Sequence, residues 1–380
     1  MIRRPAIFAL AAVLGVWLWQ LATVHFNYSA NWTALFCTSP EWPRPAFLAS
    51  ENVYTLPGSG YDGQMYHFVA HDPWITRGAL TAIDDPALRY RRILVPALAW
   101  AVALGRDSAI HAAYLAVILG FVFLGVFWLA RAMVIQGRHP AWSLMFVLMP
   151  ATLVSIDRMT VDVGLAALTV GFVLYCENRW KVLPILACAA LTRETGLLLT
   201  AGYAVFLLSR RRFGDLLGAG ASALPAILWY VYVRGHTPPE PPDRFSSLIP
   251  LAGWIERVAH PVVYPLPHWP ALVATEMDYV ALAGVALMLG HAVWIAWQRR
   301  WNARVAAIYV FAAAIIFIGS RSVWEDAFGY GRVATPLLVL LAAEDARPRL
   351  AVGPVALIDA RIALNFYVQI KGVVRGLLGV

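Results

Sequence analysis

Long apolar segments separated by short basic clusters recur through almost the whole chain, and they constrain its fold more than any other feature. Hydrophobic residues make up 60% of the 380 residues and charged residues only 14%, whereas charged residues make up about a quarter of a typical soluble domain. The apolar segments are continuous rather than alternating, which favours helices over a β-barrel. The sequence therefore predicts an all-α, multi-pass membrane protein.

The number of apolar segments is typical of a large helical bundle. An upright helix needs about 20 apolar residues to cross a membrane. The moderately apolar tail at 350–380 forms either a further span or an interfacial helix, so about 9 to 11 transmembrane helices are expected within a single domain, 1–380. The predicted spans are 6–25, 109–131, 141–156, 161–176, 182–192, 195–208, 214–233, 278–297, 304–319 and 333–343.

Basic residues gather between the apolar segments and predict how the chain is oriented. The formal net charge is +8, but Lys and Arg clustered beside spans indicate topology and contact with anionic lipids rather than nucleic-acid binding. The clusters Arg210–Arg212 and Arg299–Arg300 mark the cytoplasmic side. A first non-cytoplasmic loop at 26–108 and a proline-rich loop at 234–277 then share the opposite face.

Two segments depart from a series of upright spans. Segment 93–104 is too short to span, so we expect an interfacial helix on the outer leaflet, with its basic lead-in Arg89–Arg92 at the level of the lipid phosphates. Segment 182–208 carries Arg193-Glu194 in its middle, and a charge at the bilayer centre costs about 2.5–3.5 kcal/mol on insertion scales. Two short helices that meet at a break facing an outer cavity avoid this cost.

The segment Tyr61 to Asp72, Y-D-G-Q-M-Y-H-F-V-A-H-D, combines acids, histidines and tyrosines within the first outer loop. Within it, Asp62 and Gly63 can form an ordinary turn. Alternatively, Asp62 lies partly desolvated between Tyr61 and Tyr66 at a membrane surface, which raises the pKa of its carboxyl. A carboxylate of raised pKa that faces a hydroxyl substrate is what a general base requires, so Asp62 is the candidate catalytic residue.

His67 and His71 are four residues apart, so they share one face of any helix that begins near Gly63. Three roles are open to them: binding a divalent metal with Asp72, binding a substrate phosphate, or lining a surface helix. Asp72 before Pro73 also fits the end of a helix. A divalent metal is thus an open prediction, and the three scattered cysteines have no metal-binding spacing and indicate no disulfide framework.

Arginines supply the positive charge of the same predicted face. Arg89, Arg91 and Arg92 either anchor the loop to anionic headgroups or clamp a phosphate, which the guanidinium group can bind through two donors. From the bundle, charged residues at span junctions either pair with one another or line a substrate cavity. These residues are Arg158, Arg193, Glu194 and Arg332.

The pattern Y-D-G-Q-M-Y followed by R-Y-R-R-I-L-V-P-A-L-A-W resembles the GT-C superfamily of polytopic glycosyltransferases, and it looks closest to bacterial, mannosyltransferase-like members tied to cell-surface glycopolymers. Such enzymes carry an acid between aromatic residues in the first outer loop and a short proline-containing interfacial helix before the second span. Asp62 and Pro96 stand at these places. The runs L-T-R-E-T at 191–195 and G-R-x-x-x-P at 331–336 are similar to such enzymes as well.

The resemblance implies a GT-C-like bundle that transfers a sugar, with inversion, from a polyprenyl-phosphate-linked donor to a lipid or glycan acceptor of the cell envelope. The site would face the non-cytoplasmic side of a bacterial inner membrane. Asp62 becomes the general base, arginines hold the donor phosphate, and a second acid would be Asp72 or Asp84-Asp85. The residues expected to bind substrate are Tyr61, Gln64, Tyr66, His67, His71, Arg89, Arg91, Arg92, Arg158, Arg193, Glu194 and Arg332.

Two other functions fit the same composition. A transporter or flippase of a lipid-linked or anionic solute predicts paired broken helices with charges at the membrane midplane, whereas this sequence has one break and gathers its charges at one face. A glycopolymer polymerase or ligase relies on a large late outer loop, for which 234–277 is the candidate. The sequence contains no glycine-rich nucleotide-binding motif, which fits a lipid-linked donor.

Overall fold

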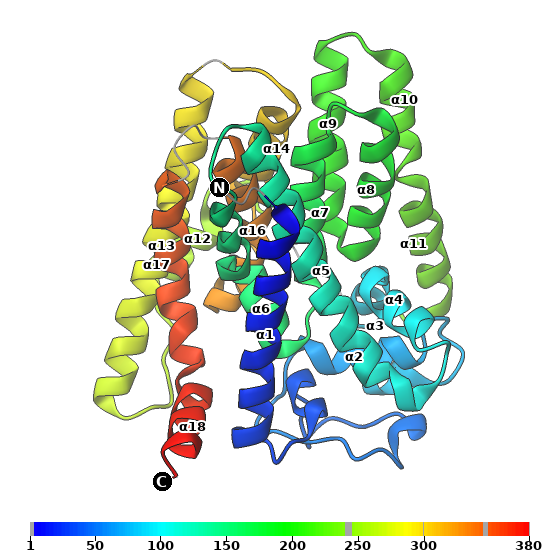
Figure 1. Ribbon diagram of the computed structural model, residues 1–380, viewed down its shortest axis with the longest axis vertical. Helices are drawn as coiled ribbons and strands as arrows, with labels where there is room; N and C mark the ends of the chain where they lie inside the picture. Colours follow the sequence, from blue (N-terminus) through cyan, green and yellow to red (C-terminus); the bar gives the residue numbers. More distant parts are fainter. Residues whose placement is uncertain (1–3, 240–244, 299, 345–348, 380) are drawn as a thin grey trace.

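The protein is built from α-helices joined by short 3₁₀ helices and loops (Figure 1). Across the residues that the computed structural model describes there is no β-strand, and only two isolated bridges occur. The predicted all-α class is confirmed. Arg3, Arg299 and residues 240–244 of the proline-rich loop lie outside the described residues. The described residues are 4–239, 245–298, 300–344 and 349–379.

Every predicted span falls in one or two of the observed helices, although some boundaries move. The span predicted at 278–297 belongs to a helix that begins at His268. The helices are α1 (Pro5–Asn27), η1 (Trp32–Phe36), η2 (Ala46–Leu48), α2 (Asp62–His71), η3 (Ala79–Ala82), α3 (Pro86–Arg91), α4 (Leu94–Val102), α5 (Asp107–Ile135), η4 (Pro140–Leu148), α6 (Pro150–Arg158), α7 (Asp162–Tyr175), α8 (Arg179–Thr192), η5 (Glu194–Gly196), α9 (Leu197–Ser209), α10 (Phe213–Ala221), α11 (Leu224–His236), α12 (Ala252–Ala259), α13 (His268–Trp297), α14 (Ala303–Ile316), α15 (Arg321–Trp324), α16 (Ala327–Glu344), α17 (Arg349–Asn365) and α18 (Tyr367–Leu378).

Four helical segments are long and apolar enough to cross a membrane within the described residues: α1, α5, α10 with α11, and α13. Two bent pairs bring the number to six if each counts as one span. These pairs are η4 with α6, bent by 58°, and α17 with α18, bent by 64°. The tail, as far as Leu378, is therefore two helices with a sharp bend. Helices α7, α9 and α14 are apolar but shorter. Such a chain is compatible with a multi-pass membrane protein.

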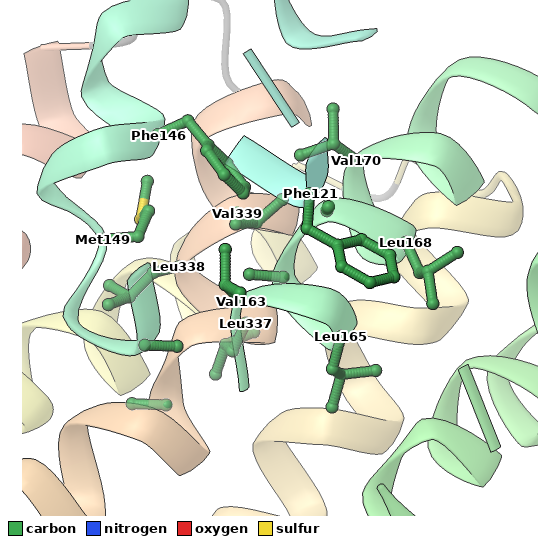
Figure 2. Close-up of a cluster of buried hydrophobic side chains, with 14 of the residues drawn as sticks. Phe121, Phe146, Met149, Val163, Leu165, Leu168, Val170, Leu337, Leu338 and Val339 are labelled. Atoms are coloured by element: carbon green, nitrogen blue, oxygen red, sulfur yellow. The ribbon is translucent and has the colours of Figure 1, made fainter. Parts of the chain in front are cut away.

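The core of the bundle forms around α7. Every residue from Asp162 to Val173 is buried, as expected for a helix that is apolar on all sides. Figure 2 shows its side chains Val163, Leu165 and Leu168 among those of α5, η4 and α16, including Phe121, Phe146 and Leu338. Because α7 is enclosed in this way, the acidic residue at its start is held inside the protein.

The segment between α1 and α5 gathers at one end of the bundle, drawn in blue and cyan in Figure 1. It contains α2, α3 and α4, and α4 lies where the sequence predicts an interfacial helix. One detail of that prediction is wrong. Arg89 and Arg92 are only 7% and 6% exposed, so they point into the protein instead of lying at a lipid surface. Acidic partners supplied by other segments make their burial possible.

The predicted break at Arg193-Glu194 is present. Helix α8 ends at Thr192, Arg193 has extended backbone angles, and the chain turns through η5 into α9. Gly196 allows this tight return, because a Cβ there would collide with the carbonyl group of Ala189. Arg179 at the start of α8 lies 3.5 Å from Asp215 near the start of α10. Because α10 follows α9 directly, this contact brings the end of α9 back to the start of α8. Helices α8 and α9 therefore form a hairpin, and the break is its tip.

The proline-rich loop is partly helical. It contains α12, whose Arg257 donates to Asp278 of α13 at 2.6 Å. Arg361 of α17 donates to the same carboxylate at 2.8 Å. This buried pairing attaches the loop to α13 and α17 of the bundle.

Close packing between α9 and α14 can be tested with two glycines. A Cβ on Gly202 would lie 2.5 Å from the Cα of Ala307, whereas nothing lies within 4 Å of one on Gly290 of α13. We expect Gly202→Ala to lower the thermal unfolding temperature in detergent, since overpacking typically costs 1–3 kcal/mol. Gly290→Ala is the matched control and is expected to leave it unchanged or raise it, because alanine favours helix by about 1 kcal/mol. Equal effects of both changes would contradict the helix packing.

Candidate active site

Asp62 is the first residue of α2, and it does not form the Asp-Gly turn that the sequence allows. The helix N-terminus favours a negative side chain at this position. Gly63 brings the start of α2 against α6, since a Cβ there would collide with the carbonyl oxygen of Arg158 and would lie 3.0 Å from that of Phe36. The small residue after Asp62 thus places its carboxylate inside the protein.

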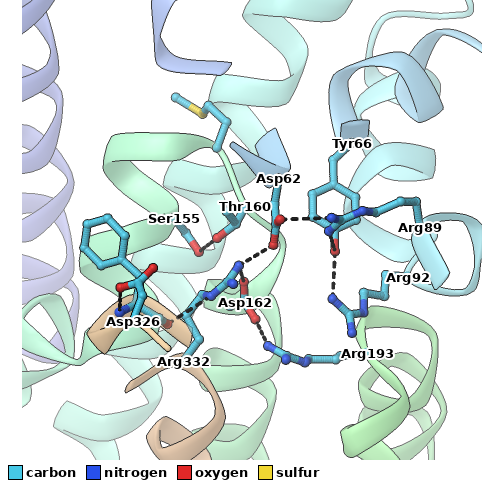
Figure 3. Close-up of polar contacts among 12 residues, drawn as sticks. Asp62, Tyr66, Arg89, Arg92, Ser155, Thr160, Asp162, Arg193, Asp326 and Arg332 are labelled. Atoms are coloured by element: carbon cyan, nitrogen blue, oxygen red, sulfur yellow. Dashed lines mark hydrogen bonds and ion pairs between the residues drawn. The ribbon is translucent and has the colours of Figure 1, made fainter. Parts of the chain in front are cut away.

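The Asp62 carboxylate lies between two arginines that come from opposite directions (Figure 3). Arg89 of α3 lies 3.0 Å from Oδ1, and Nη1 of Arg332 from α16 donates to Oδ2 at 2.6 Å. Only 19% of the Asp62 side chain is exposed, and 8% and 12% of the two arginine side chains. Segments 27 and 270 residues away in the sequence therefore meet at this one carboxylate (89 − 62 and 332 − 62).

These arginines reverse the predicted basicity of Asp62. Burial by itself raises the pKa of the Asp62 carboxyl, but the positive charges of Arg89 and Arg332 and their hydrogen bonds outweigh it, and they hold the pKa well below its ordinary value. The expected raised pKa of Asp62 is thus wrong. The sequence argument counted desolvation, whereas the contacts that lower the pKa come from distant segments.

The ion pair extends on both sides into a network of alternating charge. On one side Arg89 donates twice to Asp84, at 2.9 Å from Nε and 2.6 Å from Nη2. On the other side Arg332 lies 3.5 Å from Asp162 at the start of α7. Asp162 in turn pairs with Arg193 at the tip of the α8–α9 hairpin. The order along the network is therefore acid, arginine, acid, arginine, acid, arginine.

A second pair lies beside this network and connects to it through Tyr66. Arg92 binds both carboxylate oxygens of Glu194. The Tyr66 hydroxyl accepts from Arg92 at 3.0 Å and from Arg89 at 3.5 Å. Four arginines and four acids thus balance in charge, and they join α2, α3, α7, the hairpin tip and α16.

All four arginines and two of the four acids, Asp62 and Glu194, line a cavity of about 500 Å³. An apolar groove of about 260 Å³ lies between α9 and α14. The groove adjoins the polar cavity, since Glu194, Phe245 and Val333 line both of them. The groove is otherwise formed by side chains such as Leu198, Phe311 and Ile315. The polar cavity is lined by Asp62, Asp85, Leu88, Arg89, Arg92, Arg193, Glu194, Phe245, Ser322, Val323, Gly329, Arg332 and Val333.

Several predicted site residues do not line this cavity. The side chain of Gln64 accepts from the backbone N–H of Ser39 at 2.9 Å, and so it orders the preceding loop. Arg158 lies over the rings of Tyr61 and Phe328, with its guanidinium carbon 5.1 Å and 5.3 Å from their centres. Arg91 faces a separate cavity with Tyr230 of α11.

The predicted histidines face away from the cavity, toward α5. His67 is fully buried, and burial, followed by the charges of the neighbouring histidines, lowers its pKa well below the ordinary value. Burial also lowers the pKa of His71 to about 4, despite its contact with Asp107. Asp72 accepts from the backbone N–H groups of Thr76 at 2.8 Å and Arg77 at 2.9 Å. It therefore caps the turn after α2 and is already engaged there.

Two acids of the network, Asp84 and Asp162, were not among the residues expected to bind substrate. Asp84 was open as a second acid of the loop, and the structure brings it to Arg89. At its span junction, Asp162 could either pair with another charge of the bundle or line a substrate cavity, and the structure pairs it with Arg193 and Arg332. Phe245 and Ser322, which also line the cavity, carried no recognisable signal.

Comparisons with protein-family models, with curated proteins and with solved structures found no match for this chain. The functional argument therefore depends on the geometry of the site and on the motifs in the sequence.

The network should be essential for stability. Asp162 and Arg193 are 3% and 5% exposed, and removing one partner of a buried ion pair typically costs 3–5 kcal/mol. We expect Asp162→Asn and Arg193→Met each to lower the thermal unfolding temperature strongly, and the double variant to recover much of the loss. Glu256→Gln, which breaks an exposed pair with His260, is the control and is expected to change little. Additive losses in the double variant would contradict direct pairing.

Proposed function

We propose that this protein is a membrane glycosyltransferase of the GT-C type, which transfers a sugar from a polyprenyl-phosphate-linked donor to a hydroxyl of a cell-envelope acceptor. The observation that carries the proposal is Asp62 held between Arg89 and Arg332 in a polar cavity that adjoins an apolar groove. A phosphate, a sugar and a long apolar chain in one molecule would suit that combination of surfaces.

The arginines supply the binding energy for the donor phosphate. Each is already paired with an acid, so an entering phosphate competes for their donors. Arg89 and Arg332 are partners of Asp62, and a phosphate that draws them away removes the charges that lower the pKa of Asp62. Donor binding would therefore raise the basicity of the carboxylate at the moment when it is needed.

The reaction step follows from this arrangement. Asp62 accepts the proton of the acceptor hydroxyl as its oxygen attacks the anomeric carbon of the donor sugar. The new carbon–oxygen bond forms on the face opposite the bond that breaks, and the leaving polyprenyl phosphate takes the electron pair. The arginines stabilise the charge that develops on the leaving phosphate, which lowers the barrier.

The rest of the fold fits this assignment. The short apolar helices α7, α9 and α14 together with the longer ones would make a bundle of about 9 to 11 spans. Positive clusters such as Arg210–Arg212 would then be cytoplasmic, and the segment 26–108 with α2 would lie on the outer face of a bacterial inner membrane. The sugar donor would reach the cavity sideways from the lipid through the apolar groove.

Removal of the Asp62 carboxylate tests the mechanism. Wild type and Asp62→Asn, purified in detergent, would be given polyprenyl phosphate sugars together with envelope lipid extract. We expect Asp62→Asn to lower turnover by about 10² to 10⁴, the range for loss of a general base. Donor affinity should persist or increase, because the arginines lose a competing anion. Glu41→Gln, an exposed acid of the same loop, serves as the control.

The outcomes distinguish this proposal from the alternatives. Turnover by Asp62→Asn within about threefold of wild type would remove Asp62 as the base, since acid–base catalysis contributes far more. Uptake of intact donor into proteoliposomes without cleavage of the sugar–phosphate bond would instead assign the protein as a flippase.

The apolar groove can be tested separately. Ala314 lines it, whereas the neighbouring Ala313 is exposed on another face of α14. We expect Ala314→Trp to raise the KM for a long-chain donor about tenfold, since displacing about two buried methylenes costs about 1.6 kcal/mol. A donor with a short prenyl chain should be affected much less. Ala313→Trp is the matched control, and equal effects of the two changes would place the chain elsewhere.

A further inference from the structure

Three histidines meet between α2 and α5, outside the cavity described above. His67 and His71 lie one turn apart on α2, and His111 lies in the first turns of α5. One ring nitrogen of each lies within 4.8 Å of those of the other two. Two of the three side chains are buried, so this is an enclosed cluster of imidazoles and not a surface patch.

The distances fit a tetrahedral metal ion. Nε2 of His67 and Nε2 of His71 are 3.2 Å apart. Zinc binds imidazole nitrogen at about 2.0–2.1 Å, which separates two ligands of a tetrahedron by about 3.3–3.4 Å. The two nitrogens of α2 thus already lie near the separation that a shared ion requires.

The surroundings of His71 are those of a metal ligand. Its Nδ1 lies 2.8 Å from Asp107, and Arg77 donates twice to the same carboxylate, each time at 2.8 Å. A carboxylate that accepts from one ring nitrogen leaves the lone pair of the other available and fixes the ring, as is usual for metal-binding histidines. This carboxylate is held in place independently of His71 by the guanidinium group.

The other two rings are oriented but incompletely hydrogen-bonded. Phe36 stacks on His67 with 4.1 Å between ring centres. Among the described residues, neither Nδ1 of His67 nor Nε2 of His111 has a hydrogen-bond partner, although both atoms are buried. Unpaired buried polar atoms are costly, and an ion shared with Nε2 of His67 and Nε2 of His71 would offset this cost at Nε2 of His111, whereas Nδ1 of His67 lies on the other side of its ring and is not a ligand.

We infer that His67, His71 and His111 bind a divalent transition-metal ion of the zinc class, with Asp107 orienting His71 and a fourth position left for water. Asp72, the third ligand suggested by the sequence, is engaged by backbone N–H groups, and His111 takes its place. The ion connects α2 to α5. Helix α2 also carries Asp62 and Tyr66, so the metal fixes the helix that positions these two side chains in the charged network. This site does not depend on the proposed transfer reaction.

Cobalt binding tests the site directly. The full chain, purified with a tag that contains no histidine and stripped with a chelator, would be titrated with Co²⁺ and followed by the visible absorption of tetrahedral cobalt. We expect one equivalent to bind and Zn²⁺ to displace it. Zinc alone should raise the thermal unfolding temperature of the stripped wild type.

Two variants make the assignment specific. His111→Ala, which alters the least buried ligand, should lose the cobalt absorption and the zinc-induced rise in unfolding temperature. His260→Ala removes an exposed histidine of α12 and should retain both. Wild type that takes up no stoichiometric cobalt would overturn the proposal, and so would His111→Ala that binds like wild type.

Discussion

The structure depends on one buried network in which arginines and acids alternate from Asp84 through Asp62 and Asp162 to Arg193. Buried charges are tolerated only when each has a partner, because the loss of hydration is otherwise uncompensated. Several of the ion pairs join charges from different segments of the chain. The first loop brings two acids and two arginines, while α7, the hairpin tip and α16 bring the others. Correct assembly of these four parts of the chain is therefore the condition under which these charges can be buried.

The equal numbers of arginines and acids also determine the basicity of Asp62. With four arginines matched by four acids, the cavity has little net charge, and the carboxylate of Asp62 is a weak base. An anionic ligand changes this state by competing for the guanidinium groups, so binding and basicity are coupled through shared partners. In the proposed reaction, such a site would stay inactive until the donor phosphate binds. That property suits a reaction in which water, a competing nucleophile, must not be activated before the donor is bound.

Much of the fold follows from the sequence because its causes are local. Apolar runs predict α1, α5 and α13, and Arg193-Glu194 predicts the break between α8 and α9, since an unpaired charge within a continuous span is costly. The candidate site was found only in part. Asp62 and the arginines carry clear signals, but Gln64 looks like a binding residue and instead orders the loop at Ser39. His111 gave no signal, because a single histidine at the start of an apolar helix acquires meaning only beside His67 and His71.

By itself, the sequence determined that the chain forms an all-α bundle of apolar helices and that its charge gathers in the first loop and at one break. These results follow from hydrophobicity and helix length, which are properties of contiguous residues. Only the tertiary structure decided which charges meet, that the pKa of Asp62 is lowered and not raised, and that the histidines of α2 point to α5. These outcomes depend on electrostatic contacts over a few ångströms between residues up to 270 positions apart, and no local pattern encodes that proximity.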